Sequence, residues 1–128
     1  MLAVDTNVVV RYLVGDDPEQ SDKARRLFQD TAVWISATVL LEAAWVLRKT
    51  YRYRPDQIAW SFRLMAGRST VTLQNPAALF RAFTWMRRMD FADALHLAQS
   101  EDLDALVTFD RDFVLAAADV ESTPVRLL

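Results

Sequence analysis

The sequence contains no cysteine, one histidine, two glycines and four prolines among its 128 residues. Without cysteine the chain cannot form a disulfide, a thiolate zinc site, an iron–sulfur cluster or a cysteine nucleophile. A single histidine, His96, excludes a metal site built from several imidazoles. With 52% hydrophobic residues and so little glycine and proline, the composition is typical of a compact domain and excludes disordered and collagen-like chains.

Charge of neither sign dominates, because the chain has 15 Lys and Arg and 17 Asp and Glu, which gives a formal net charge of −2. Binding of nucleic acid through overall positive charge is therefore excluded, and a polyanion would have to meet a local basic patch. No apolar run approaches the roughly 20 residues of a membrane helix. Charged residues from Asp5 onwards argue against a secretory leader. We expect a cytoplasmic protein, without a membrane partner, that forms a single domain over residues 1–128.

Short apolar runs alternate along the chain with segments of helical periodicity. Helices are expected from Ser36 or Thr38 to Lys49, over 56–66, from Asn75 or Pro76 onwards, and over 90–102. Alternating strands and helices predict an α/β fold with a parallel sheet covered on both faces, where sites form beyond the carboxyl ends of the strands. The expected strands are Leu2–Val4, Val33–Ile35, Val71–Leu73, Ala105–Phe109 and Val125–Leu127.

Two acids directly follow expected strands, and two more lie on expected helices. Asp5 and Asp110 end the first and fourth strands, so both are expected at the same edge of a parallel sheet. Glu42 is expected on an apolar helix face, where a buried carboxylate needs a partner. Asp93 lies in the first turn of its helix among small and apolar neighbours and is expected to face inward.

A cluster of these acids would need a cation. Two carboxylates ~5 Å apart repel by roughly 3 kcal/mol at an effective dielectric constant of 20. The chain has only two lysines, Lys23 and Lys49, and most of its arginines fall on expected helix surfaces or loops. A site made of oxygen ligands favours Mg²⁺, with Mn²⁺ as a substitute, and such ions suit phosphate ester chemistry.

Each acid taken alone has a structural alternative. Asp5 and Asp110 can end strands and begin turns, and Asp93 fits the first turn of a helix next to the helix dipole. Glu42 is harder to explain by packing, because an acid on an apolar helix face is usually paired or functional. The four tryptophans are expected first in the core, and only second on a dimer face or partner groove.

The acidic motifs together resemble a known family. The segments Asp5-Thr6-Asn7, Glu42 after Ser36, Asp93-Ala94-Leu95-His96 and Thr108-Phe109-Asp110 resemble, in order and spacing, the motifs of PIN-domain ribonucleases. In length and layout the chain resembles a VapC-type toxin of a toxin–antitoxin pair. The resemblance implies a three-layer α/β/α sandwich with a central parallel sheet, Mg²⁺-dependent cleavage of RNA, a cognate antitoxin partner and a homodimer. The alternative is a non-catalytic PIN fold that binds RNA or protein.

The resemblance also assigns residues to roles. Asp5, Glu42, Asp93 and Asp110 match the catalytic acids of the family, with Asp5, Asp93 and Asp110 as metal ligands. Asp112 remains an alternative to Asp110, because relatives differ over the acidic position in this stretch. Supporting roles fall to Thr6 and Thr108, whose hydroxyls lie beside acids, and to Asn7, which resembles the residue that holds the first Asp by a hydrogen bond.

A basic and aromatic segment at 48–54 begins in the last turn of the helix expected to end at Lys49. Interleaved cations and aromatic rings are the chemistry that binds phosphates and stacks on unpaired bases. Cations in the last turn of a helix also complement its dipole, which is the structural alternative. The candidate RNA-binding residues are Arg48, Lys49, Tyr51, Arg52 and Arg54.

Overall fold

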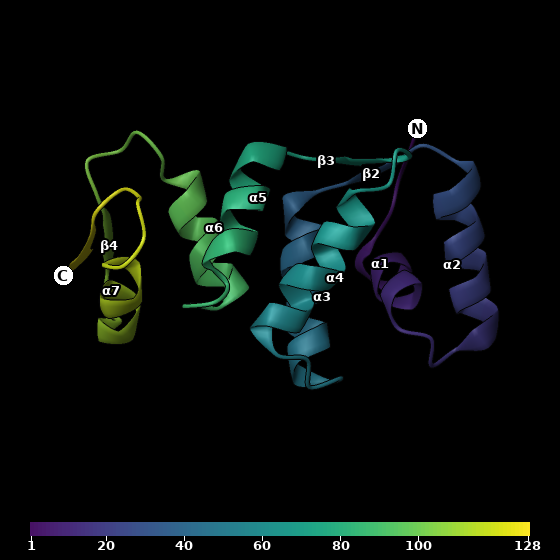
Figure 1. Ribbon diagram of the computed structural model, residues 1–128, viewed down its shortest axis with the longest axis horizontal. Coiled ribbons are helices and arrows are strands. Elements are labelled where there is room, and N and C mark those ends of the chain that lie inside the picture. The colour runs from purple at the N-terminus through teal and green to yellow at the C-terminus, as the bar shows by residue number, and fades with distance from the viewer. The chain divides into compact units, whose positions relative to one another are not determined.

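A computed structural model describes all residues from 1 to 128, and the chain divides into two compact units, Met1–Pro76 and Ala77–Leu128. The first unit contains three strands and four helices (Figure 1): β1 (Leu2–Ala3), α1 (Thr6–Leu13), α2 (Pro18–Asp30), β2 (Val33–Ile35), α3 (Ala37–Lys49), α4 (Pro55–Ala66) and β3 (Val71–Leu73). The second contains α5 (Pro76–Trp85, which begins at the boundary), α6 (Phe91–Gln99), β4 (Leu106–Thr108), α7 (Arg111–Ala117) and β5 (Val125–Leu127).

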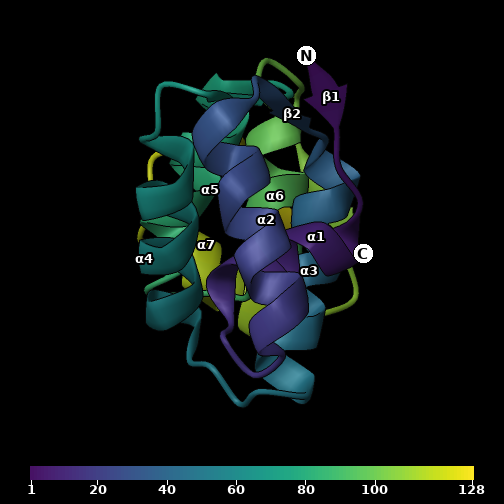
Figure 2. The same cartoon turned by 90° about the vertical axis from the view of Figure 1, so that its right-hand side faces the viewer.

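The first unit is built on a parallel sheet of strand order β1-β2-β3. Its register pairs Leu2 with Val33 and Val33 with Val71. Strand β2 lies in the middle, and the side chains of Val33 and Ile35 are fully buried there, as expected for the central strand of a covered parallel sheet. Helix α1 packs against α2 and α3 (Figure 2). Helix α3 also packs against α4.

Polar side chains cap the helices of the first unit. Asp5, Asp17 and Ser36 precede α1, α2 and α3, and each accepts a hydrogen bond from the backbone amide three residues later. Such N-caps satisfy amides that have no partner within the helix. Helix α2 also begins with Pro18, whose fixed φ suits the first helical position.

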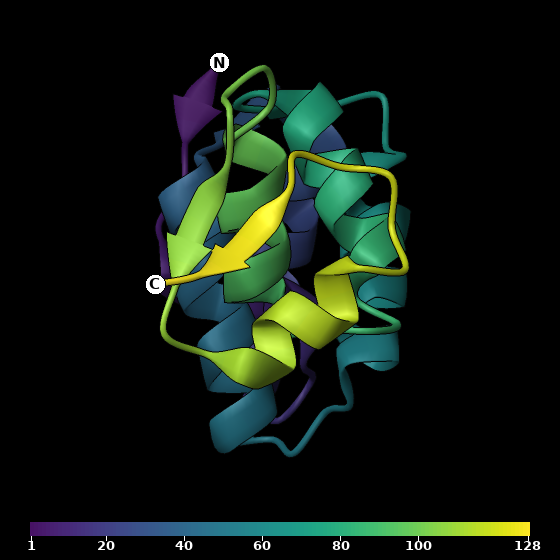
Figure 3. The same cartoon turned by 90° about the vertical axis from the view of Figure 1, so that its left-hand side faces the viewer.

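The second unit contains the parallel pair β4 and β5, in which Leu106 pairs with Val125. Figure 3 shows these strands side by side, with α7 below them. Helix α7 contacts both strands and begins directly after Asp110, its N-cap. The aromatic rings of Phe83 and Phe91 lie 6.0 Å apart, joining the buried faces of α5 and α6.

The expected strands are all present and all pair in parallel, so the predicted α/β class with parallel strands is confirmed. Helices α3, α4, α5 and α6 lie where periodicity predicted helices, although the last ends at Gln99 instead of residue 102. Helices α1, α2 and α7 were not predicted. In α1 the β-branched run Val8-Val9-Val10 obscures the helical pattern, since such residues favour strands. None of the helices is long and apolar enough to cross a membrane.

Candidate functional site

Asp5 lies where β1 gives way to α1. Its Oδ1 accepts a hydrogen bond of 3.2 Å from the amide of Val8, and the side chain is exposed. Asn7 was expected to hold this carboxylate, but the hydrogen bond that Asp5 accepts comes from the Val8 amide and not from Asn7. Thr6, the first residue of α1, is buried. One oxygen of Asp5 is therefore engaged in capping, and Oδ2 accepts no hydrogen bond.

Glu42 is exposed, which corrects the expectation that it lies on a buried apolar face. The buried side of α3 is formed by Leu40, Ala43, Ala44 and Leu47. Glu42 lies on the other side, together with Trp45, which is 62% exposed. The helix is apolar around most of its circumference, so the sequence pattern alone did not reveal which side is buried. Glu42 needs no buried partner in this position.

Asp93 and Asp110 interact within the second unit. Asp93 lies in the first turn of α6 and is half-buried. Burial is the main cause that raises the pKa of Asp93, and repulsion from the carboxylates of Asp110 and Asp90 raises the pKa further, while His96 lowers it. No lysine or arginine contributes to this balance. Asp93 is thus partly withdrawn from solvent, and two other acids of its surroundings, Asp110 and Asp90, act on its pKa.

The turn between β4 and α7 fixes the position of Asp110. The hydroxyl oxygen of Thr108, the last residue of β4, accepts a hydrogen bond of 3.0 Å from the Asp110 amide. The Oδ1 of Asp110 in turn accepts bonds from the amides of Asp112, at 2.9 Å, and Phe113, at 3.2 Å. Asp112 is exposed, and its side chain forms no hydrogen bond or ion pair. Asp110 is the acid of this turn whose charge raises the pKa of Asp93.

The donor atoms of this acidic pair fit a divalent metal ion. Neither unit by itself brings together three or more His, Asp or Glu side chains that could hold a metal. Mg²⁺ is nevertheless commonly bound through only one or two carboxylates, with water completing its octahedral shell. Two repelling carboxylates with no basic partner, one of them half-buried, have the charge and ligand type that such an ion requires.

The basic segment at 48–54 forms a hollow on the first unit. Tyr51 does not line it, because its hydroxyl donates to Asp16 at 2.7 Å and accepts from Arg11 at 3.3 Å. Sequence reasoning missed both this contact and Tyr53, which lines the hollow in its place. The volume is about 440 Å³, and the lining residues are Arg48, Lys49, Arg52, Tyr53, Arg54 and Pro55.

Two comparisons bear on the family. The model of the PIN domain family matches residues 2–119, which leaves out only the first residue and the last nine. No curated protein sequence matches the chain. With seven helices and parallel strands, the family match confirms the predicted fold class, the α/β/α sandwich with a parallel sheet.

Proposed function

Because the chain belongs to the PIN-domain family, we propose that it is a metal-dependent endoribonuclease that hydrolyses RNA phosphodiester bonds. PIN domains are usually nucleases, which supports the reaction class. The observation that carries the proposal for this chain is that Asp93, a half-buried carboxylate, is repelled by the Asp110 carboxylate, with no lysine or arginine lowering the pKa of Asp93. Without a bound cation, the repulsion within such a pair lowers the stability of the folded protein.

We assign the site to four acids, Asp5, Glu42, Asp93 and Asp110. The proposal rests on the order and spacing of their motifs and on the family match. Asp5, Asp93 and Asp110 would hold Mg²⁺, or Mn²⁺ in its place, and Glu42 completes the set. The bound ion would supply a water of lowered pKa and positive charge beside the scissile phosphate.

The reaction is hydrolysis. A water oxygen forms a bond to phosphorus, the bond between phosphorus and the 3′ oxygen breaks, and the 3′ oxygen takes up a proton. One carboxylate of the set accepts the proton that the water loses. The products carry a 5′ phosphate and a 3′ hydroxyl. In this scheme the Thr108 hydroxyl positions Asp110 through its 3.0 Å bond to the Asp110 amide, and Thr6, buried beside Asp5, helps to position that acid.

We propose that the protein is the toxin of a toxin–antitoxin pair, acts in the cytoplasm, and is held inactive by a small cognate antitoxin. The similarity of its acidic motifs to those of VapC-type toxins supports this role. Growth arrest on expression of the chain, and its rescue by the product of an adjacent short gene, is the expected result. Growth unaffected by active enzyme would contradict it.

A homodimer is also part of the proposal. Three large apolar side chains of the first unit are exposed on α3 and α4: Trp45 at 62%, Trp60 at 64% and Leu64 at 58%. Exposed apolar surface of this kind is typical of an interface. Tryptophans were expected in the core, so these two positions differ from that expectation. Light scattering is expected to give the dimer mass, and Trp60→Glu to give the monomer mass; a parent of monomer mass would contradict the assignment.

Cleavage of total RNA by the purified protein tests the enzymatic proposal directly. Discrete products are expected with Mg²⁺ or Mn²⁺ and not with EDTA, and they should disappear in Asp5→Asn and Asp93→Asn. Asparagine retains N-cap ability, so Asp5→Asn removes the charge without unravelling α1. Cleavage that survives both substitutions would reject the site. Metal binding without cleavage of any RNA would favour the non-catalytic binding module.

A further inference from the structure

We propose that the basic hollow between α3 and α4 binds the phosphate backbone of single-stranded RNA at a point distinct from the acidic site. Four of its six lining residues are cations, and none is an acid. All six come from 48–55, and none of the four proposed catalytic acids is among them. The inference rests on the proposed function in one respect, because that function identifies the bound polyanion as RNA.

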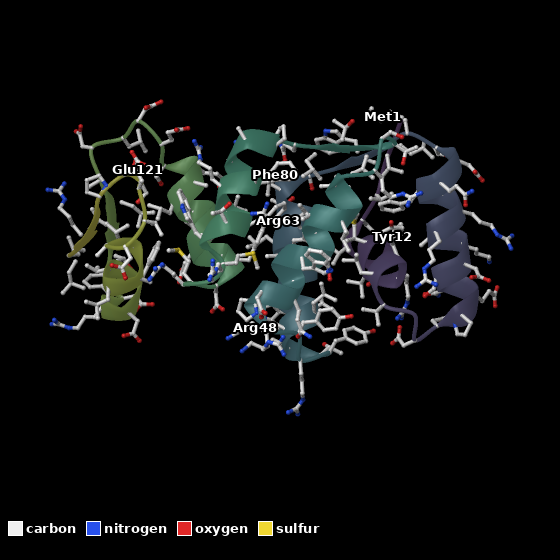
Figure 4. All side chains as sticks on the ribbon, viewed as in Figure 1. Met1, Tyr12, Arg48, Arg63, Phe80 and Glu121 are labelled. Atoms are coloured by element: carbon white, nitrogen blue, oxygen red, sulfur yellow. The ribbon has the colours of Figure 1, made fainter.

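The local charge stands out against that of the whole chain. Four of the 15 lysines and arginines line this one hollow, in a protein whose formal net charge is −2. Arg54 bonds the carboxylate of Asp56 at 3.1 Å, which fixes its guanidinium at the start of α4. Lys49 and Arg52 are exposed and form no ion pair, so their charges are available to a ligand. Figure 4 shows Arg48 near the end of α3, where this segment begins.

The backbone at Arg52 is the second observation. Its φ of 58° lies in the left-handed region, which is unfavourable for any residue with a Cβ and natural for glycine. Residues held in such conformations gather at functional sites, where the surrounding structure maintains them. A long cationic side chain at a position suited to glycine indicates that the side chain itself has a use.

The surrounding contacts hold this turn in place. On one side of Arg52, the Tyr51 hydroxyl bonds Asp16 at 2.7 Å. On the other, the Tyr53 amide bonds the carbonyl of Leu47 at 3.0 Å. These contacts hold the backbone of the turn in place, which lowers the entropic cost of ordering it on binding.

The lining chemistry favours RNA over an acidic protein segment. Guanidinium groups bind phosphate oxygens in a planar, bidentate manner and also stack on bases. The aromatic ring of Tyr53 is a stacking surface for an unpaired base, which an acidic peptide would not use. The first turn of α4, which begins at Pro55, adds the positive end of a helix dipole, partly offset by Asp56.

Binding of a short fluorescent single-stranded RNA to the full chain in EDTA tests the inference without cleavage. The double variant Lys49→Gln/Arg52→Gly is expected to bind roughly tenfold more weakly at low salt. The slope of log K against log salt should fall by about 1.4, because each lost contact to single-stranded nucleic acid removes about 0.7. Its melting temperature should not fall, since glycine relieves the strained backbone at position 52.

The control is Arg26→Gln/Arg68→Gln, which removes the same charge from exposed residues of the first unit outside the hollow. This variant should retain the affinity and salt slope of the parent. Equal losses in both double variants would overturn the inference, as would a parent that binds no RNA in EDTA. Unchanged RNA binding with lost binding of polyglutamate would overturn it in favour of an acidic protein partner. Cleavage with Mg²⁺, measured separately, decides the proposed enzyme.

Discussion

The carboxylate of Asp110, at the start of α7, raises the pKa of Asp93 in α6. The two acids are separated by a strand in sequence and brought together by the fold of the second unit. Burial of Asp93 is the larger cause, and the repulsion adds to it. At neutral pH and without metal, this pair therefore destabilises the folded protein.

Removing one charge should stabilise the metal-free protein. The pKa of Asp93 is higher in the folded protein than in the unfolded chain, where it is about 3.9. Protonation of Asp93 therefore stabilises the fold fully below the unfolded-state pKa. This stability is lost as pH rises through the folded-state pKa. Asp93→Asn should therefore raise the melting temperature at pH 7 in EDTA and show a smaller decrease in stability as pH rises above about 4. Asp104→Asn, at an exposed acid of the same unit, should do neither. A lower melting temperature for Asp93→Asn at pH 7 would contradict this account.

Divalent metal should reverse the destabilisation. A ligand that binds only the folded state at ten times its dissociation constant stabilises it by about 1.4 kcal/mol. We expect Mg²⁺ or Mn²⁺ to raise the melting temperature of the parent at pH 7 and to leave that of Asp93→Asn unchanged. Thermal scans over a metal titration provide the measurement. A parent that shows no shift at millimolar metal counts against the site.

Substitutions at Asp110 separate its capping role from its charge. Asp110→Ala removes the acceptor of the Asp112 and Phe113 amides and should cost about 1 kcal/mol of stability, whereas Asp110→Asn keeps an acceptor. Both should lose RNA cleavage. Asp112→Asn should retain it, because Asp110 is the acid of this turn that raises the pKa of Asp93. If Asp112→Asn is inactive and Asp110→Asn active, the fourth acid is Asp112.

A substitution of Glu42 tests its role in RNA cleavage separately from any effect on stability. Since its side chain is exposed, Glu42→Gln should change the free energy of unfolding by no more than about 0.5 kcal/mol. The rate of RNA cleavage should nevertheless fall by about 100-fold, the lower range for loss of a proton-transferring group. Asp22→Asn, at an exposed acid of α2, is the matched control. Full activity in Glu42→Gln would remove it from the proposed site.

Tyr51→Phe should loosen the turn that shapes the basic hollow. The Tyr51 hydroxyl bond is the main cause that lowers the pKa of Asp16, assisted by Arg11. Because its pKa is lowered by folding, the Asp16 carboxylate stabilises the fold above its unfolded-state pKa. This stability is lost as pH falls through the folded-state pKa of Asp16. The variant should melt below the parent at pH 7, and the difference should shrink below about pH 4. A difference that is independent of pH would contradict the role of Asp16.

Several features of the molecule could be predicted from local sequence. The strands are short apolar runs that stop at polar residues, and burial on both faces makes such runs recognisable. Acids directly after strands could be placed at strand ends, as Asp5 and Asp110 are. Helix α1 was not predicted because its valines favour strands, although Asp5 is a suitable N-cap. The order of acidic motifs predicted the family, which the match over residues 2–119 confirms.

The sequence by itself therefore determined the α/β class, the strand positions and the family, because these depend on local patterns of burial and on the order of motifs. Only the tertiary structure decided which side of α3 is buried, because a helix that is apolar on most sides can pack on more than one of those sides. Glu42 is exposed as a result. It alone joined Asp16 to Tyr51, 35 residues apart, and coupled Asp93 to Asp110. Hydrogen bonds and carboxylate repulsion act over a few ångströms in space, and separation along the chain does not encode that distance.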